Sequence, residues 1–412
     1  MHDQNAFIAE VQSVGRELLA YCRNHDWAGH DPYDALNSRL LGTIPFLDWR
    51  IPRIAMTQLL KRSPINLRGL LQIPRTQNPK AIALFISALL RAPSLAPKGA
   101  DATVDSLVER LAALRSPGVP YWCWGYSFPW QTRSDIVPRW TPNLVCTCFA
   151  AGAFLDLYEA RYEPEHLRMA ISGAEYILNE LYWCGESSVA GFGYPLRSVR
   201  NQVHNANLLG AALLVRVYRH TGESRFLTPA LKVARYSAAQ QRPDGSWPYG
   251  EAPSQQWVDN FHTGYVLCAL HQIDEFMNSD EFGPAIARGF HFFRSNFLER
   301  NGAVRYFHNR LYPIDIHCVA QSIITLVVLR ARFSNSLDLA SDVFWWVRKH
   351  MWNADGSFAY RKLPGTTIRT PYMRWSEAWM LSALAYALQG ASATMDQDPE
   401  FITACMNEMR SC

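Results

Sequence analysis

The most restrictive feature of this sequence is a repeat with a period near 57 residues. Apolar segments with helical spacing recur from Pro142 onward, and each begins at a polar cluster. The clusters are marked by Asn143, His204, Asp259, His317 and Arg374. A second amphipathic helix is expected in each interval, at Glu165–Leu181, Arg225–Gln240, Glu281–Leu298 and Ser336–Met351. No strand-like alternation of useful length is present, so the pattern predicts an all-α chain of helix–loop–helix units.

A turn motif repeats in the same register. Gly245, Gly302 and Gly356 each follow Asp or Asn, and each precedes a tyrosine by four residues. Asp, Asn and Gly tolerate a positive φ at low cost, so these positions are expected to be tight turns. The tyrosines Tyr249, Tyr306 and Tyr360 would then fold the loops back over the helix ends.

The number of units points to a closed ring. Five units are clear, and a weaker one near Asn78 makes six. Six helix pairs of this length favour a closed (α/α)6 toroid, and an open solenoid of stacked pairs is the alternative. Small residues at Ala150–Ala153 suit tight packing of the inner helices. We expect residues 1–412 to form a single toroid domain, in which residues 1–115 are a degenerate N-terminal helical part.

Composition excludes several classes of protein. Lys and Arg number 40 against 36 Asp and Glu, and this balance does not predict nucleic-acid binding. No apolar run approaches the roughly 20 residues of a transmembrane helix. The N-terminus shows no basic segment followed by an apolar one, so a cytoplasmic location is expected. The nine cysteines are scattered and are expected to be reduced thiols.

Polar pairs at helical spacing occupy the start of each expected inner helix. In a ring, these helix N-termini converge on one mouth and present unpaired N–H groups to it. The pairs are Asn143 with Thr147, His204 with Asn207, Asp259 with His262, His317 with Gln321, and Arg374 with Glu377. They predict a polar pocket. The alternatives are that Asp259 and Asp315 only cap helices and that Arg374 only pairs with Glu377.

An aromatic loop is expected to line the same pocket. Residues 121–130 contain six aromatic side chains together with Gly and Pro, in a pattern that fits neither a helix nor a strand. Such a loop suits stacking against sugar rings or against an apolar polycyclic ligand. No H-x3-H or H-E-x-x-H spacing is present, so neither a metal site nor a cofactor is expected.

Short motifs resemble known families. Gln240–Trp247 is similar to the Q-x(2-5)-G-x-W turn motif of terpenoid cyclases, but their aspartate-rich catalytic motif is absent, which argues against that chemistry. A broader resemblance is to VpsJ-like bacterial exopolysaccharide-biosynthesis proteins, carried by the segments 31–38, 61–68, 259–265 and 374–379. This resemblance implies a role in polysaccharide production, alongside other exopolysaccharide-assembly proteins.

The expected architecture also resembles toroidal uronate-polysaccharide lyases and epimerases, in which Asn or Arg neutralises a carboxylate while His or Tyr moves a proton. From this resemblance, together with the polar residues expected at the mouth, the candidate catalytic residues are His262, His317, Asp259, Tyr265, Glu377 and Tyr306. The candidate substrate-binding residues are Trp122, Trp124, Trp130, Asn143, His204, Asn205, Asn260, Asp315, Gln321, Tyr372, Arg374 and Trp375.

The leading hypothesis is a carbohydrate-active enzyme that acts on a poly- or oligosaccharide containing uronic acid. One alternative is a glycoside hydrolase that uses two of Asp259, Asp315 and Glu377. Another is a glycan-binding assembly protein without catalysis. A basic stretch at residues 50–75, which includes Lys61, Arg62 and Arg68, predicts either peripheral contact with the inner membrane or an ordinary solvated face.

Overall fold

The structure, a computed structural model, describes residues 4–40, 49–132, 135–186 and 188–395. Its centre is a ring of inner helices, and each contacts the next around the ring. The ring closes because the last inner helix packs against the first, which excludes the open solenoid and confirms the (α/α)6 toroid. In chain order the inner helices are α3 (Pro79–Arg91), α5 (Leu144–Arg161), α7 (His204–Thr221), α9 (Asn260–Met277), α11 (Ile316–Val328) and α13 (Ala378–Met395).

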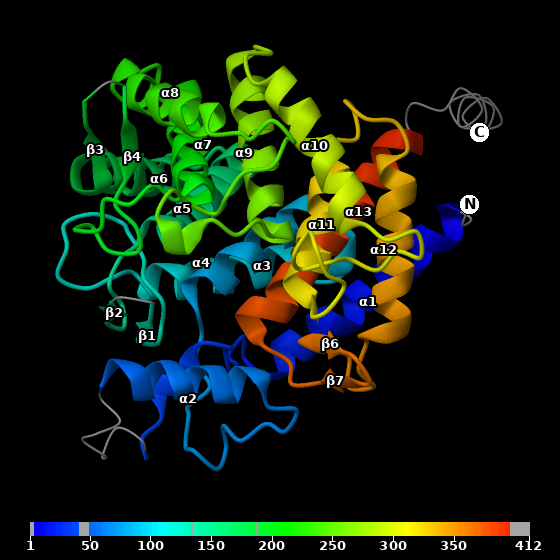
Figure 1. Ribbon diagram of the computed structural model, residues 1–412. Helices are drawn as coiled ribbons and strands as arrows, with labels where there is room; N and C mark the ends of the chain where they lie inside the picture. The colour runs from blue at the N-terminus through cyan, green and yellow to red at the C-terminus, as the bar shows by residue number, and fades with distance from the viewer. Residues whose placement is uncertain (1–3, 41–48, 133–134, 187, 396–412) are drawn as a thin grey trace.

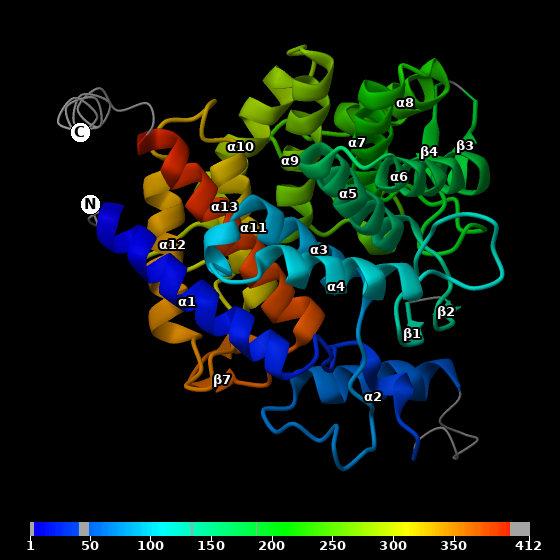
Figure 2. The same cartoon turned by 180° about the vertical axis from the view of Figure 1, so that it is seen from behind.

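An outer layer of helices covers this ring (Figure 1). Five of them, α4 (Ala100–Ala113), α6 (Pro164–Tyr176), α8 (Ser224–Ala239), α10 (Gly283–Phe297) and α12 (Ser336–His350), follow their inner partners in the chain. The sixth is α1 (Gln4–Asn24), which packs against α13 at the other end of the sequence. The two ends of the chain therefore complete one helix pair, as Figure 2 shows.

The inner helices are buried on nearly all sides. Every residue of α11 from Ile316 to Val327 is buried, because neighbouring inner helices and the outer layer cover it together. Small residues permit this close approach: a Cβ on Gly264 of α9 would lie 2.7 Å from Cγ of Gln321 on α11. Within the described ranges, no helix is both long and apolar enough to cross a membrane.

The loops contain short strands that the sequence pattern did not predict. They are β1 (Trp130–Gln131), β2 (Ile136–Val137), β3 (Tyr182–Cys184), β4 (Ala190–Phe192), β5 (Ile314–Asp315), β6 (Arg361–Leu363) and β7 (Thr366–Ile368). They pair as β1–β2, β3–β4 and β5–β6–β7, antiparallel throughout. Strands of two or three residues are too short to show an alternation in the sequence, and they leave the chain mostly helical, as predicted.

The repeated glycines are turns of the predicted kind. The φ angles of Gly245, Gly302 and Gly356 are 90°, 84° and 83°. At Gly302 a Cβ would also lie 2.2 Å from the carbonyl oxygen of Asp342. In the segment that resembles the cyclase turn motif, the buried Trp247 donates its indole N–H to the Ser237 carbonyl at 3.1 Å.

One helix of the N-terminal part lies outside the ring. Helix α2 (Arg50–Arg62) is set off from the toroid on the side where β1, β6 and β7 lie (Figures 1 and 2). It packs against the short helix η1 (Asp34–Asn37) around a small apolar cluster of Ala35, Leu60 and Ile73. Residues 1–115 thus contribute one full helix pair (α3–α4), the outer partner of α13 and this external element.

Candidate functional site

A cavity of about 890 Å³ lies where the inner helices begin. The second residue of every inner helical segment lines it, counting the π-helical turn η7 (Met373–Glu377) as the start of the last one. These residues are Lys80, Val145, Asn205, Phe261, His317 and Arg374. Four of the helices begin at a capping Asn or Asp, which fixes this register: Asn78, Asn143, Asp259 and Asp315.

Asp259 and His262 form a hydrogen-bonded pair at the start of α9. One carboxylate oxygen of Asp259 accepts the backbone N–H of His262 at 3.0 Å, which confirms that Asp259 is a cap. The other oxygen accepts the ring Nδ1–H at 2.7 Å and the indole N–H of Trp257 at 2.9 Å. Because the carboxylate holds the proton on Nδ1, the free Nε2 can accept a proton from a ligand in the cavity.

A second histidine is buried beside the first. Nε2 of His317 lies 2.6 Å from the hydroxyl of Tyr265, and the ring stacks between Phe261 and Trp379. Burial, followed by the positive charges of Lys80 and Arg374, holds the pKa of His317 well below its usual range. Burial raises the pKa of Tyr265. Both side chains are therefore neutral at pH 7, and the Tyr265 hydroxyl can donate a proton.

The cavity lining is strongly basic. Lys61, Arg62, Lys80, Arg310, Arg361 and Arg374 line it, whereas Asp259 is the one acidic residue among the described lining residues. The charges of two of the arginines are balanced by carboxylates outside the cavity lining. Arg374 makes a bidentate ion pair with Asp31 at 2.7 and 2.9 Å, and Arg361 bonds Asp315 at 2.6 Å. The remaining excess of positive charge favours an anionic ligand.

Two buried lysines in this lining have no carboxylate partner among the described residues. Lys80 lines the cavity, and its Nζ lies over the rings of Phe149 and Trp379, at 4.1 and 5.0 Å from the centroids. Lys61 of α2 hydrogen-bonds the Tyr33 hydroxyl. Burial holds the pKa of Lys80 well below its ordinary value, and burial together with Arg361 lowers that of Lys61 to about 7. An anion in the cavity would supply the missing counter-charge.

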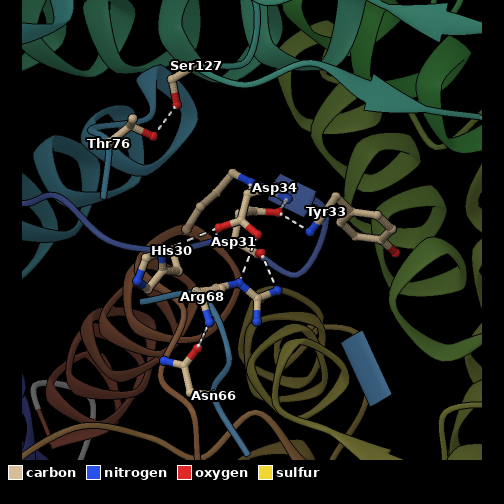
Figure 3. A network of polar contacts seen from close by, with 9 residues as sticks. His30, Asp31, Tyr33, Asp34, Asn66, Arg68, Thr76 and Ser127 are labelled. Carbon is tan, nitrogen blue, oxygen red and sulfur yellow. Dashed lines mark hydrogen bonds and ion pairs between the residues drawn. The ribbon is translucent and has the colours of Figure 1, made fainter. Parts of the chain in front are cut away.

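A buried polar network attaches the N-terminal segment to the ring (Figure 3). Asp34 accepts Nε of Arg68 at 2.8 Å, and the same guanidinium donates to the Asp31 carbonyl at 3.0 Å. His30 lies 3.6 Å from the Asp34 carboxylate. With Asp31 bound to Arg374, the network joins three of the segments that carried the VpsJ-like resemblance: 31–38, 61–68 and 374–379.

The structure brings about half of the predicted site residues together. Those that line the cavity are Trp130, Asn205, Asp259, His262, Tyr265, Tyr306, His317, Arg374 and Trp375. Those that lie elsewhere are Trp122, Trp124, Asn143, His204, Asn260, Asp315, Gln321, Tyr372 and Glu377. The aromatic loop is divided in the same way: Tyr126, Phe128 and Trp130 line the cavity, but Trp124 is buried in the core against Phe154.

Two predicted carboxylates, Asp315 and Glu377, do not line the cavity because they bond other groups in the protein. Asp315 caps α11 through the backbone N–H of His317 at 3.0 Å, as the structural alternative predicted. Glu377 accepts the backbone N–H of Phe358 at 3.0 Å, and burial raises its pKa well above the ordinary value. The predicted Arg374–Glu377 pair is wrong, because Arg374 bonds Asp31 instead.

Four of the other outlying residues have contacts away from this cavity. The side chain of Asn143 caps α5, and Asn260 donates to the Ser322 hydroxyl at 3.0 Å. Gln321 lines a separate cavity of about 180 Å³ between the inner helices. Tyr372 lies under the Arg68 guanidinium. His204 is fully buried, and burial lowers its pKa to about 4.

Sequence reasoning missed several cavity residues, chiefly Tyr33, Lys80, Tyr194, Arg310 and Arg361. The same position in each inner helix would have identified Lys80. It lies two residues after the capping Asn78, just as His317 lies two residues after the capping Asp315. No local pattern singles out the others: Tyr33, Tyr194 and Arg310 reach the cavity from loops, and Arg361 reaches it from the start of β6. The described His, Cys, Asp and Glu side chains form no group able to hold a metal ion.

The comparisons with known proteins give the class of the fold. Neither a family model nor a curated protein matches this sequence. Among solved structures, a cellobiose 2-epimerase from Spirochaeta thermophila is 14% identical, with a TM-score of 0.58 over 77% of this chain and 87% of that one. A polysaccharide lyase is 11% identical, with a TM-score of 0.58 over 92% and 97%. A GH76 α-mannanase from Bacteroides thetaiotaomicron is 10% identical, with a TM-score of 0.58 over 78% and 88%. At these identities the likeness shows the fold, that of the (α/α)6 toroid proteins.

Proposed function

We propose that this chain is an enzyme that acts on an anionic sugar, a poly- or oligosaccharide containing uronic acid, by removing the proton next to the carboxylate. The observation that carries this proposal is the placement of the Asp259–His262 pair and the Tyr265–His317 pair in one basic cavity. Known proteins of this fold include a sugar epimerase and a polysaccharide lyase, so the fold accommodates such chemistry.

The roles of the side chains follow from their protonation states. Nε2 of His262 accepts the proton at C5, because Asp259 holds Nδ1–H and stabilises the imidazolium that forms. The carboxylate of the sugar gains negative charge as the proton leaves, and Lys80 and Arg374 stabilise it. Tyr265, backed by His317, donates a proton either to C5 from the other face, giving epimerisation, or to the leaving oxygen at C4, giving elimination.

A glycoside hydrolase is less well supported. Both of its mechanisms need two carboxylic acids across the sugar. Of the described residues that line the cavity, Asp259 alone carries a carboxyl group, and it already bonds His262 and Trp257. Asp315 lies behind Arg361, and Glu377 faces away from the cavity toward the Phe358 backbone.

The cellular role follows from the VpsJ-like resemblance. We propose that the enzyme modifies a polysaccharide or its lipid-linked precursor during exopolysaccharide biosynthesis, in the cytoplasm and together with other assembly proteins. This role agrees with the anionic ligand that the basic cavity favours.

The test is incubation of the purified protein with oligosaccharides of different uronate content in D2O. Exchange of the C5 proton for deuterium, read by mass spectrometry and NMR, would show proton abstraction. Ultraviolet absorbance of an unsaturated uronate would identify the reaction as elimination, and an inverted C5 as epimerisation. Neutral oligosaccharides of the same length are the matched control.

Two outcomes would overturn the proposal. Hydrolysis without exchange would favour the hydrolase. Binding of uronate oligosaccharides without exchange, cleavage or inversion would favour the glycan-binding protein. The variant Lys80→Met keeps the apolar stem and removes the amine. Whichever reaction is found, this variant should bind the anionic oligosaccharide more weakly and the neutral one equally well.

A further inference from the structure

An apolar and basic surface lies next to the cavity, on α2 and the loop that follows it. Five large apolar side chains there are 66% to 79% exposed: Trp49, Ile51, Leu59, Ile65 and Leu70. Only one other large hydrophobic side chain in the described chain is as exposed. It is Tyr162, which follows α5 at the far end of the inner helices. The concentration of such residues within one short segment marks an interaction site.

The charge of this surface is of one sign. Arg39, Arg50, Arg62 and Arg75, which belong to this stretch of the sequence or flank it, are exposed. From Trp49 to Ala100 the sequence contains no Asp or Glu. Two other basic residues of the stretch predicted as a surface, Lys61 and Arg68, are buried and do not contribute. A Trp and aliphatic side chains mixed with arginine are the composition of segments that lie in a membrane interface.

The geometry of α2 links this surface to the cavity. Ile54, Gln58 and Lys61 on one face of the helix line the cavity, while Ile51, Ala55 and Leu59 on the adjoining face are exposed. Because α2 lies outside the ring, nothing in the described chain covers that second face (Figures 1 and 2).

We propose that Trp49, Ile51, Leu59, Ile65 and Leu70, with these exposed arginines, dock this protein on the surface of an anionic phospholipid membrane. The apolar side chains enter the headgroup region, and the arginines contact lipid phosphates. The cavity mouth beside α2 then lies at the membrane surface, where the sugar of a lipid-linked substrate would be presented. Docking itself does not depend on the proposed reaction.

The experiment is co-sedimentation of the full chain with vesicles of phosphatidylglycerol and phosphatidylethanolamine, compared with vesicles of phosphatidylcholine alone. Binding to the anionic vesicles is expected, and it should decrease with salt. The double variant Ile51→Ser/Leu59→Ser should bind at least about tenfold more weakly, because two aliphatic contacts are lost. The variant Arg50→Gln/Arg75→Gln should lose affinity for the anionic vesicles specifically.

Tyr162→Ser is the matched control, since it removes an equally exposed side chain far from α2 and should bind as the natural chain does. Thermal melts and turnover of a soluble oligosaccharide should not change in any of these variants, which separates docking from catalysis. Absence of binding to anionic vesicles, or equal binding by Ile51→Ser/Leu59→Ser, would contradict the proposal. If the natural chain forms a dimer and Ile51→Ser/Leu59→Ser is a monomer, the face binds a second copy of the chain and the proposal is wrong.

Discussion

The hydroxyl of Tyr265 on α9 lies 2.6 Å from Nε2 of His317 on α11, and both groups are buried in the wall of the cavity. Three residues before Tyr265, on the same helix, His262 is held by Asp259 and is the more exposed of the two histidines. One inner helix thus carries a histidine able to accept a proton and a tyrosine able to donate one. This relationship defines the first set of variants to make.

Replacement of either histidine should abolish turnover without unfolding the protein. At position 262, Gln retains a hydrogen bond but cannot accept a proton. At position 317, Gln replaces the imidazole that contacts the Tyr265 hydroxyl with an amide. We expect His262→Gln and His317→Gln to reduce kcat by about 10²- to 10⁴-fold, with melting temperatures near that of the natural chain. Folded variants with normal exchange at C5 would remove these histidines from the mechanism.

Asp259→Asn separates the two roles of this residue. Asn is as good a helix cap as Asp, so α9 should remain intact and the melting temperature should change little. The amide cannot stabilise an imidazolium, so kcat should fall while KM stays nearly constant. Asp315→Asn at the equivalent cap instead leaves the buried Arg361 without its carboxylate, so this variant should have a lower melting temperature. A larger effect on KM than on kcat would mean that Asp259 only shapes the binding site.

Affinity for an anionic sugar should depend on pH through Lys61. Its pKa is lowered to about 7, chiefly by burial, so the free site carries this charge below that pH and loses it above. Binding measured by calorimetry should therefore weaken as pH rises through 7, and proton uptake should accompany binding near neutral pH. The variant Lys61→Gln should bind more weakly at pH 6 and show a flatter profile. A profile identical to that of the natural chain would assign the dependence to another group.

Removal of one partner of the Asp31–Arg374 pair should be costly. Both side chains are about 5% exposed, so Asp31→Asn leaves a buried guanidinium without its carboxylate. We expect a loss of about 3–5 kcal/mol in the free energy of unfolding, measured by urea denaturation. The double variant Asp31→Asn/Arg374→Gln should recover part of this loss. Additive effects would show that the two residues stabilise the protein independently.

Glu377→Gln tests the buried carboxyl group. Because burial raises its pKa, the folded protein keeps the proton above the pH at which the unfolded chain releases it. Glu377 therefore supports stability at acid pH, and this contribution is lost as pH rises above about 4.5. Gln cannot ionise, so the variant should be at least as stable as the natural chain at pH 7 and retain activity. Loss of activity in a folded Glu377→Gln variant would show that Glu377 takes part in the reaction.

The sequence by itself determined the repeat, and the repeat determined most of the fold. Its period, the Asp-Gly and Asn-Gly turns and the capping residues are local signals, because each acts within a few bonds of the residue that carries it. They were sufficient for the closed toroid and for the placement of Asp259, His262 and His317 at its mouth. Asn143 and Asp315 lie in the same register but do not line the cavity: both cap their helices, and Asp315 also bonds Arg361 from behind the lining.

Only the tertiary structure decided which side chains face the cavity and which partners they take. Arg374 bonds Asp31 across 343 residues rather than the neighbouring Glu377, because ring closure brings α13 against the N-terminal segment. The packing of α2 against η1 likewise places Lys61 beside Tyr33, and among the described residues none covers the outer face of α2. Such contacts depend on chain segments that are distant in sequence, and no local pattern of residue types specifies them.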